Sequence, residues 1–367
     1  MFKKYLQNRF SNSILVYICV YLTAIKKLIL SMKKITIKDI AIKAEVSIST
    51  VSFVINGKGE KMGISAAVIK KVQDIAEKLH YRPSMIATSL RTGKTRSIGL
   101  IVEDISNQFF ADLARVIEDE AKNIDYRVFY CSTGDDDERS EELIHSLLQA
   151  NVDGFIITPT QNLEDKIDLL LKLKKPVVLV DRYFPGQQVS HVVMDNYEAS
   201  NSATKFLIDK GCKNIAVVNI TSEMIQMTLR EDGYRDALKE VGMYNESLVL
   251  HVNYHSNEET RIEELVNFFN KNPKIDAVLF LANYMGLAGL QAFRGMGIRI
   301  PEDIAVISFD DHDSFKLHTP TISVIAQPIE DIAINAIQLL MSQMTDMEVF
   351  EVEKCLKKGN LIIRESV

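Results

Sequence analysis

From Ser97 onward the chain alternates short apolar runs with amphipathic stretches, and this alternation limits its fold more than any other feature. Runs such as 98–102, 177–180 and 277–281 are apolar along their whole length and long enough for strands. Strands that are apolar on both faces need helices on both sides, which indicates parallel α/β sheets. Further strands are expected at 127–131, 155–158, 192–194, 215–219, 248–252 and 304–308. Helices are expected at 110–123, 138–149, 163–173, 197–210, 229–241, 258–270 and 284–295.

The cycle restarts after residue 194, which predicts two similar lobes, each with a doubly wound parallel sheet. Ligands of such sheets bind beyond the carboxyl ends of the strands. Polar residues stand at those ends: Glu103-Asp104, Thr158, Asp181-Arg182, Asn283 and Asp310-Asp311. Carboxylate, amide and guanidinium groups suit a hydroxyl-rich small molecule bound between the lobes. The alternative is that these are ordinary loop residues.

A different pattern, at 36–56, predicts two short helices joined by a tight turn. Thr36 is placed to cap the first helix, with Asp39 in the capping-box position, and Ser47 is placed to cap the second. In the second helix Val51, Val54 and Ile55 point one way, whereas the opposite face carries Ile48, Ser49, Ser52, Phe53 and Asn56. Such a face suits a DNA major groove, where apolar groups touch thymine methyls and Asn reads base edges. An ordinary helical hairpin with exposed apolar residues is the alternative.

A third helix is expected after the basic loop 57–63, capped by Ser65 and apolar along one face. The three helices would form a compact module that ends at Pro83. A short helix over 84–90 and a linker over 91–96 would follow.

Charge separates this module from the rest of the chain. The net charge is −6, but residues 32–97 carry 13 Lys and Arg against 5 Asp and Glu, whereas residues 98–367 carry 25 against 44. A basic head on an acidic body indicates that the head meets a polyanion.

Residues 1–31 match neither part. Their apolar run at 14–25 is shorter than the ~20 residues that a membrane-spanning helix needs. It could be the core of a signal peptide, but no small-residue cleavage site follows. We favour a misplaced start, with Met32 as the natural N-terminus, and expect no membrane partner.

No metal or cofactor site is expected. The four cysteines have no paired spacing, which argues against zinc or disulfides and for a reducing compartment. Neither the pair His251 and His255 nor the cluster at 310–313 completes a metal-ligand set.

The order of these features resembles the LacI/GalR family of bacterial transcription regulators. The resemblance runs from Lys34 to Arg364 and is most specific in the pieces IKDIAIKAEVSISTVSFVIN, IS and KVQDIAEKLHYRP of 37–83. Further pieces follow in the correct order: DISNQFF (104–110), LVDRYF (179–184), REDGYRDAL (230–238), IPEDIAVISFDD (300–311) and TISVIAQPI (321–329). The resemblance implies an all-α helix-turn-helix headpiece, a hinge helix and a periplasmic-binding-protein-like α/β sensor.

The resemblance also implies roles in DNA binding. Its base-facing positions are Ile48, Ser49, Phe53 and Asn56, and its phosphate contacts are Thr50, Ser52 and Lys58. Thr36, Ser47 and Tyr81 complete the expected DNA-binding set, and Leu90 would be the apolar wedge in the minor groove. Family members often have Arg in place of Phe53, so the operator differs. Glu45 replaces the usual turn Gly, which implies local strain, and the loop 57–63 is longer than common.

In the sensor, the family's effector positions fall on Phe110, Thr158, Asp181, Arg230, Asn283, Asp310 and Ile329. The polar ones would hold hydroxyls or a carboxylate, and Phe110 would stack on a ring. Tyr284 replaces the usual Asp and would reshape the pocket wall. A carbohydrate or its derivative is the expected effector, with purines and other small metabolites as alternatives.

The expected organisation has four parts. They are an N-terminal extension (1–31), a helix-turn-helix DNA-binding domain (32–83), a hinge helix and linker (84–96), and an effector-binding and dimerisation domain (97–367). Lobe 1 would span about 97–194 and 329–350, and lobe 2 about 195–326 and 352–367.

The expected protein is a cytoplasmic, homodimeric regulator, a repressor by preference, whose affinity for operator DNA responds to a small-molecule effector. No heptad segment trails the last strand, so a dimer is favoured over a tetramer. An enzyme is not expected, because no nucleophile elbow or dinucleotide fingerprint is present. The alternative is an extracytoplasmic sugar-binding protein anchored by its N-terminal segment, although a basic helical head does not suit that role.

Overall fold

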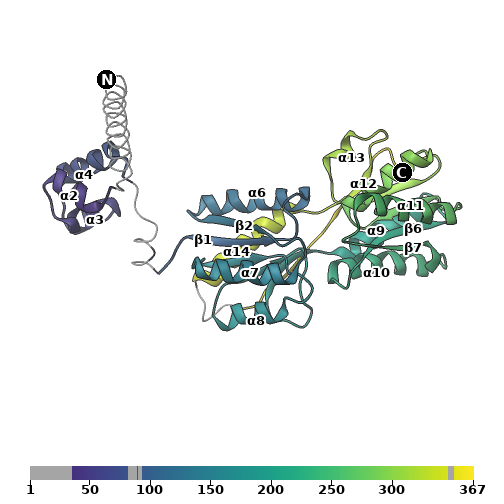
Figure 1. Cartoon of the computed structure of the whole chain (residues 1–367), viewed down its shortest axis with the longest axis horizontal. Helices are drawn as coiled ribbons and strands as arrows, with labels where there is room; N and C mark the ends of the chain where they lie inside the picture. Colours follow the sequence, from purple (N-terminus) through teal and green to yellow (C-terminus); the bar gives the residue numbers. More distant parts are fainter. Residues whose placement is uncertain (1–34, 82–88, 90–92, 346–350) are drawn as a thin grey trace, which may run out of the picture. The chain divides into compact units, whose positions relative to one another are not determined.

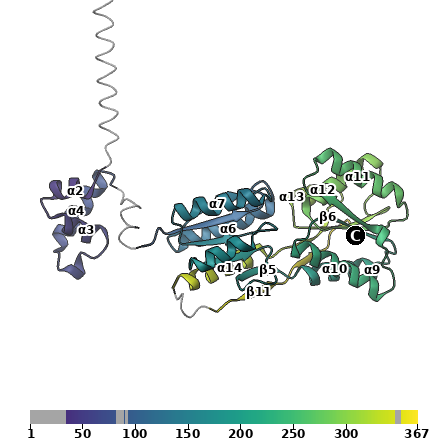
Figure 2. The same cartoon turned by 60° about the horizontal axis from the view of Figure 1, so that its bottom comes forward.

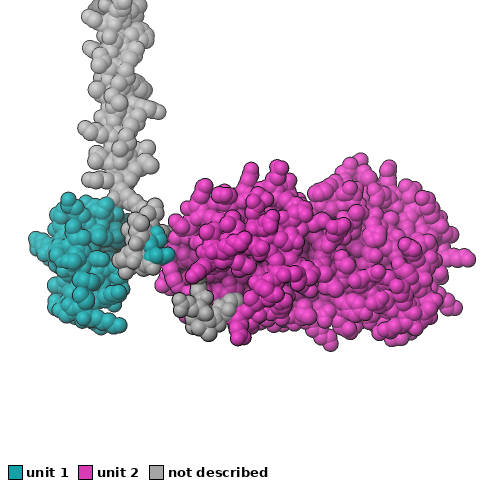
Figure 3. All heavy atoms as spheres, turned by 90° about the horizontal axis from the view of Figure 1, so that it is seen from below, with its two compact units in different colours: residues 1–93 teal, residues 94–367 magenta. Residues whose placement is uncertain are grey.

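The computed structural model describes residues 35–81, 89, 93–345 and 351–367. They fall into two compact units, Met1–Gly93 and Lys94–Val367 (Figure 3). The first unit holds the predicted head and the second holds the predicted sensor. The N-terminal extension, Leu90 and most of the expected hinge helix lie outside the described residues.

Three helices, α2 (Ile37–Ala44), α3 (Ile48–Ile55) and α4 (Ala66–Lys78), pack around the small core of the head. The core side chains come from all three, with Ile40, Val51 and Val72 fully buried. The loop between α3 and α4 contains a short 3-10 turn, η1 (Glu60–Met62).

Two of the three capping hydrogen bonds predicted for the helices of the head are present in the structure. The backbone N of Thr36 donates to Asp39 Oδ2 at 2.8 Å, which completes the predicted capping box. The backbone N of Thr50 donates to Ser47 Oγ at 3.0 Å. Ser65 does stand at the N-cap of α4, but its side chain makes no capping hydrogen bond, so this part of the prediction was wrong.

Lobe 1 of the sensor is an entirely parallel six-stranded sheet in the order β11-β5-β4-β3-β1-β2, with α6 and α14 on one face and α7 and α8 on the other (Figure 1). Alternation along β1 sends Ile98, Leu100 and Val102 to the α6 face and Ile101 to the other. Its elements are β1 (Ser97–Val102), α6 (Gln108–Asn123), β2 (Arg127–Ser132), α7 (Asp137–Gln149), β3 (Gly154–Ile157), α8 (Glu164–Lys172), β4 (Val177–Val180), β5 (Ser190–Met194), α14 (Ile329–Thr345) and β11 (Lys354–Lys357).

Lobe 2 repeats this plan in the order β12-β10-β9-β8-β6-β7, with only β12 antiparallel to its neighbour. A single large core joins the sheet to the helices around it. Its elements are α9 (Asn196–Asp209), β6 (Ile215–Thr221), α10 (Ile225–Glu240), η2 (Glu246–Leu248), β7 (Val249–Asn253), α11 (Glu258–Lys271), β8 (Ala277–Phe280), α12 (Asn283–Met296), β9 (Ala305–Phe309), α13 (Asp313–Leu317), β10 (Ser323–Ala326) and β12 (Asn360–Ile362).

The chain crosses between the lobes three times: after β5, after β10 and between β11 and β12 (Figure 2). The third crossing corrects the expected boundary at residue 352. Lys354–Lys357 pair with β5 and so belong to lobe 1, whereas Asn360–Ile362 pair with β10 in lobe 2. Among the described residues no helix has both the length and the apolarity needed to cross a bilayer.

Close packing of α9 against α10 depends on a glycine. A Cβ atom on Gly233 would collide with the carbonyl oxygen of Tyr197 and stand 3.0 Å from the backbone N of Asn201. The Asn201 amide donates to the Gly233 carbonyl at 3.1 Å, which fixes the approach of the two helices. These are backbone atoms, so no side chain can rotate to make room.

We expect Gly233→Ala to lower the free energy of unfolding of the sensor by about 3 kcal/mol, because the added methyl group forces α9 and α10 apart. Calorimetry on the full chain measures this as a fall in the melting temperature of the sensor transition. Gly295→Ala in α12 is the control, since a Cβ atom there meets nothing within 4 Å. It should leave stability unchanged or raise it slightly. Equal melting temperatures for the two variants would contradict the role of Gly233.

Candidate effector-binding site and nucleic-acid interface

The outer face of α3 is exposed in the way that its sequence predicts. Val51 and Val54 are buried in the head, whereas Ile48 is 47% exposed and Ser49 and Asn56 are exposed beside it. The other predicted members of this face, Ser52 and Phe53, are half-buried, as is Thr50. The face therefore presents an isoleucine, hydroxyl groups and an amide to the outside.

The turn before α3 shows the strain that Glu45 implied. This residue ends α2 with φ 55° and ψ 41°, the left-handed conformation that glycine adopts most easily. Its backbone N–H still bonds to carbonyls of α2, so the turn forms at a local cost.

The remaining predicted DNA contacts lie at the edges of the head. Thr36 and Lys58 are exposed, and Ser47 is exposed although its hydroxyl caps α3. Tyr81 is half-buried against the core of the head, and this burial raises the pKa of its hydroxyl.

In the sensor, residues at the carboxyl ends of the strands meet where the two lobes face each other. The Asn283 amide of lobe 2 donates to Asn107 Oδ1 of lobe 1 at 3.0 Å, and the hydroxyl of Tyr254 donates to Glu103 Oε1 at 3.0 Å. On the other side of the cleft, Gln161 Nε2 donates to Glu223 Oε2 at 3.1 Å. Polar side chains thus connect the lobes directly.

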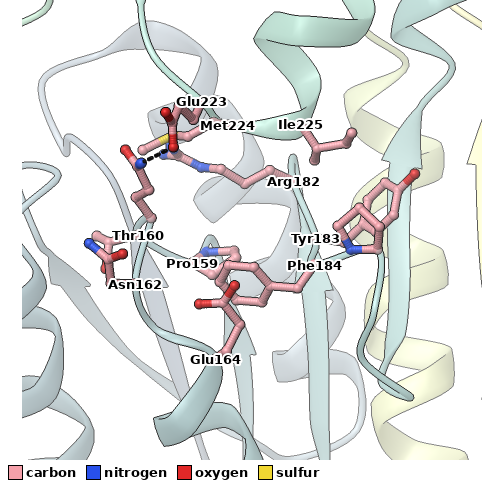
Figure 4. Close-up of a pocket in the computed structure, with 12 residues that line it drawn as sticks. Pro159, Thr160, Asn162, Glu164, Arg182, Tyr183, Phe184, Glu223, Met224 and Ile225 are labelled. Carbon is pink, nitrogen blue, oxygen red and sulfur yellow. Dashed lines mark hydrogen bonds between the residues drawn. The ribbon is translucent and has the colours of Figure 1, made fainter.

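A buried arginine, one of the polar strand-end residues expected in the cleft, lies at the centre of this junction. Arg182 is 3% exposed and forms an ion pair with Glu103, while Asp135 and Asp181 each lie 3.5 Å from its guanidinium group. It also contacts Met224 of lobe 2, toward which it points in Figure 4. Its position directly after Asp181, at the end of β4, is the pattern that predicted it.

Among the described residues we distinguish three cavities along the cleft and name each after one of its residues. The Arg182 cavity, about 290 Å³, is bounded by 159–164 and 182–185 of lobe 1 and by 223–225 of lobe 2 (Figure 4). The Glu103 cavity, about 330 Å³, lies among 103–108 of lobe 1 and Tyr254, Arg261, Asn283, Tyr284, Leu287 and His312 of lobe 2. The smaller Ile329 cavity, about 50 Å³, adjoins it.

The Ile329 cavity unites three of the predicted effector residues, Asn283, Asp310 and Ile329. It does not include Phe110, which is 3% exposed and packs in the core of lobe 1. The structure instead places the neighbouring Phe109 on the cavity wall. One position along a helix turns a side chain by about 100°, which explains the difference.

Arg230, also predicted to bind the effector, makes hydrogen bonds within lobe 2. Its Nε donates to Asn196 Oδ1 and its Nη1 to the carbonyl of Leu281, both at 2.7 Å. The guanidinium carbon lies 4.1 Å from the centre of the Phe309 ring.

The remaining predicted residues, Thr158 and Asp181, are buried at the strand ends of lobe 1. Thr158 Oγ1 has no hydrogen-bond partner among the described residues.

Two of the predicted aspartates share an unusual backbone conformation. Asp181 follows β4 with φ 67°, and Asp310 follows β9 with φ 63°. Both lie in the left-handed region, which costs about 1 kcal/mol for a residue with a side chain. Asp310 is held by Gln327 Nε2, which donates to its Oδ1 at 2.8 Å. Strained backbone at equivalent places in the two lobes supports a functional role for both residues.

Burial raises the pKa of three carboxyl groups at the cleft. Desolvation raises the pKa of Asp135 and of Asp181 from 3.8 to about 6, although Arg182 opposes the rise in both. It also raises the pKa of Asp310. Burial and Glu103 raise the pKa of Tyr254, so its hydroxyl stays protonated and donates. No group of three or more potential metal ligands is present in the described part of the chain.

Comparisons with known proteins agree with this architecture. Residues 36–84 match the family described as "Bacterial regulatory proteins, lacI family", and residues 95–349 match "Periplasmic binding proteins and sugar binding domain of LacI family". Catabolite control protein A of Priestia megaterium is 32% identical over 312 residues, which cover 84% of this chain and 92% of that protein.

Two solved structures show the same fold. The CelR transcriptional regulator in complex with cellobiose is 27% identical with a TM-score of 0.67, over 91% of this chain and all of that one. The lac repressor dimer bound to operator and the anti-inducer ONPF has a TM-score of 0.79 at 19% identity, over 91% of this chain and 99% of that one.

The raised pKa of Asp135 predicts how stability depends on pH. Because its pKa is higher in the folded chain than in the unfolded one, the folded state binds more protons between pH 4 and 6. The free energy of unfolding therefore falls as pH rises through this window, by at most about 3 kcal/mol from this group. The charges that act on Asp135 are those of Arg182, Glu103, His255 and Asp137.

Asp135→Asn should flatten this dependence, because Asn tolerates the left-handed φ of 60° and does not ionise. Calorimetric melting temperatures of the sensor at pH 4.5 and 7 provide the measurement. Asp209→Asn, on the exposed end of α9, is the control and should keep the wild-type dependence. An unchanged slope in Asp135→Asn would show that this carboxyl does not titrate near pH 6.

Proposed function

Because this chain belongs to the LacI family of bacterial regulatory proteins, and is a DNA-binding transcriptional regulator with an effector-binding domain, we propose that it is a carbohydrate-responsive repressor. The observation that carries this proposal is the combination of two surfaces on one chain: the exposed face of α3 in a basic head, and the polar cleft between the sensor lobes. Its proposed partner is chromosomal DNA, so we place it in the cytoplasm. Its relatives are transcription regulators rather than enzymes.

We infer that α3 reads the operator through its outer face. Ile48 and Phe53 would contact thymine methyls, and Ser49 and Asn56 would bond to base edges. Contacts with phosphate fix the register of the helix without reading sequence. We assign these contacts to Thr36, Ser47, Thr50, Ser52, Lys58 and Tyr81, and the minor-groove wedge to Leu90.

The proposed effector site is the cleft, where hydroxyl groups of a sugar would exchange hydrogen bonds with Thr158, Asp181, Asn283 and Asp310. The solved structure of the CelR regulator is a complex with cellobiose, which supports a carbohydrate here. Phe109 and Ile329 would contribute apolar contacts in place of the expected Phe110, and Arg230 would orient Asp181 and Asp310 rather than bind the effector itself.

Regulation would then follow from the contacts between the lobes. An effector in the cleft replaces hydrogen bonds such as Asn283–Asn107 and Tyr254–Glu103, so it binds one arrangement of the lobes more tightly than the other. That difference in affinity is the free energy available to change operator binding.

The decisive experiment recovers genomic fragments with the purified full chain and measures their affinity with and without sugars. We expect a roughly palindromic sequence whose log affinity falls steeply with log salt concentration. If no fragment is retained at low salt, the proposed function fails.

Substitutions in the head should separate the recognition of bases from the binding of phosphates. Ile48→Ala should weaken operator binding about tenfold while leaving its salt dependence unchanged, because it removes a base contact. Lys58→Ala should weaken binding to all sequences and reduce the log–log salt slope by about 1. Fluorescence anisotropy on operator and random duplexes measures both.

Ile42→Ala is the matched control for Ile48→Ala. Ile42 is 66% exposed on α2, outside the proposed reading face. An equal loss of affinity in both isoleucine variants would refute the assignment of α3.

We also propose that two copies pair through lobe 1. Strand β2 is an edge of the sheet, and its Phe129 is 46% exposed. An edge strand presents backbone N–H and C=O groups that its own sheet does not pair, and an exposed aromatic ring adds apolar surface. Such a strand is suited to contact with another chain.

Phe129→Asp should therefore give monomers by light scattering. It should also weaken operator binding more than tenfold, since two linked heads bind a palindrome with a high effective concentration. Leu173→Asp, at an exposed apolar position after α8, should remain dimeric and bind normally. A dimeric Phe129→Asp variant would exclude this edge.

A further inference from the structure

The described lining of the Arg182 cavity includes none of the residues expected to bind the effector. Lobe 1 contributes the loops that follow β3 and β4, and lobe 2 contributes the segment that leads into α10. The ion pair between Arg182 and Glu103 joins residues that line different cavities. The Arg182 cavity is therefore distinct from the proposed effector site, and its shape needs an explanation of its own.

Flat and apolar side chains border the interior of the Arg182 cavity on both sides. Pro159, which is buried, and Phe184, which is half-buried, come from lobe 1 and lie in the lower part of Figure 4. Met224 and Ile225 come from lobe 2 and lie in its upper part. An apolar interior of this kind is typical of small-molecule sites.

Tyr183 adds a second aromatic ring to this lining, and its orientation is fixed from behind. The ring stacks on the buried His191 with centres 4.2 Å apart and an angle of 8° between the planes. A wall that is already held in one rotamer loses little conformational entropy when a ligand binds.

Polar groups stand at the rim of the cavity and at its buried end. At the rim, Gln161 and Glu223 are exposed and bonded to each other across the two lobes. At the buried end, Arg182 Nε has no hydrogen-bond partner among the described residues, although Asp181 Oδ2 lies 3.5 Å from it. One N–H group of a lining side chain is thus available to an oxygen atom.

From these features we propose that the Arg182 cavity is a second small-molecule site, which takes a single flat ring with apolar faces and an oxygen substituent. The ring packs against Phe184, and its oxygen accepts a hydrogen bond from Arg182 Nε. A volume of about 290 Å³ is at the lower end for ligand cavities, which suits a molecule with one ring. Aromatic rings and the C–H faces of sugar rings share this chemistry.

The test uses the full-length protein and three neutral probes of similar size. Benzyl alcohol offers an aromatic ring, methyl β-glucopyranoside offers a sugar ring, and hexanol offers the same hydroxyl group on a flexible apolar chain. Titrations followed by saturation-transfer NMR measure the affinities. We expect at least one of the rings to bind about tenfold more tightly than hexanol, because a flexible chain loses more conformational entropy and cannot stack.

Two matched substitutions in α10 locate the bound ring. Ile225→Asp places a charge on the cavity wall at the first position of α10, where an acidic residue suits the helix. It should weaken binding of the ring on the order of tenfold or more, because the apolar face would lie against a carboxylate. Thr228→Asp, exposed about one turn further along and outside the described lining, is the control and should keep the wild-type affinity.

A third substitution tests the wall from lobe 1. Phe184→Ala removes the proposed stacking partner and should also weaken binding of the ring about tenfold. Its melting temperature, measured on the same sample, shows whether the sensor is folded. The Ile225→Asp result decides the question if the Phe184→Ala variant does not fold.

The outcomes separate the two sources of the ring. Binding of benzyl alcohol alone assigns the site to aromatic molecules, binding of the glucoside alone assigns it to sugars, and binding of both supports the shared chemistry. The proposal is overturned if neither ring binds, if hexanol binds equally well, or if the ring binds equally to Ile225→Asp and Thr228→Asp. These measurements involve no DNA, so their outcome is independent of the operator experiment that tests the proposed function.

Discussion

The burial of Arg182 between charged partners is the interaction on which the sensor depends. Taking a guanidinium group out of water costs several kcal/mol unless acceptors surround it. Here Glu103, Asp135 and Asp181 supply the negative charge. Glu103 also accepts a hydrogen bond from the hydroxyl of Tyr254 in the other lobe. The same carboxylate thus serves charge balance in lobe 1 and contact with lobe 2. A ligand that alters the charge of the cleft therefore acts on the junction of the lobes directly.

The two units of the chain carry opposite charges, and this division suits a regulator. A positively charged head is attracted to duplex DNA, whereas the strongly acidic remainder is repelled by it. Contacts with DNA are thereby concentrated on the head, whose small core leaves the outer face of α3 uncovered.

Much of the fold could be predicted from the sequence because strands and caps depend on local patterns. The apolar runs at β4 and β8 are buried over their whole length, and the Thr36 and Ser47 caps use residues three positions apart. The strand-end rule likewise located Asp181 and Asp310.

What the sequence did not reveal depends on distance and rotation. Arg182 and Glu103 are 79 residues apart, and no local sequence pattern predicts that they form an ion pair. Phe109 and Phe110 are equally apolar, so only the rotation of α6 decides which one reaches a cavity. The last two strands are short, and a partner sheet, not their composition, assigns each of them to a lobe.

The three crossings between the lobes also govern how the chain can fold during synthesis. Lobe 1 begins with β1 but needs α14 to cover one face of its sheet and β11 to complete its edge. Both segments leave the ribosome only after all of lobe 2 except β12 has been made. Lobe 1 is translated first, and one apolar face of its sheet therefore stays partly uncovered while lobe 2 is still being synthesised. Chaperone binding during translation should accordingly concentrate on the nascent first lobe.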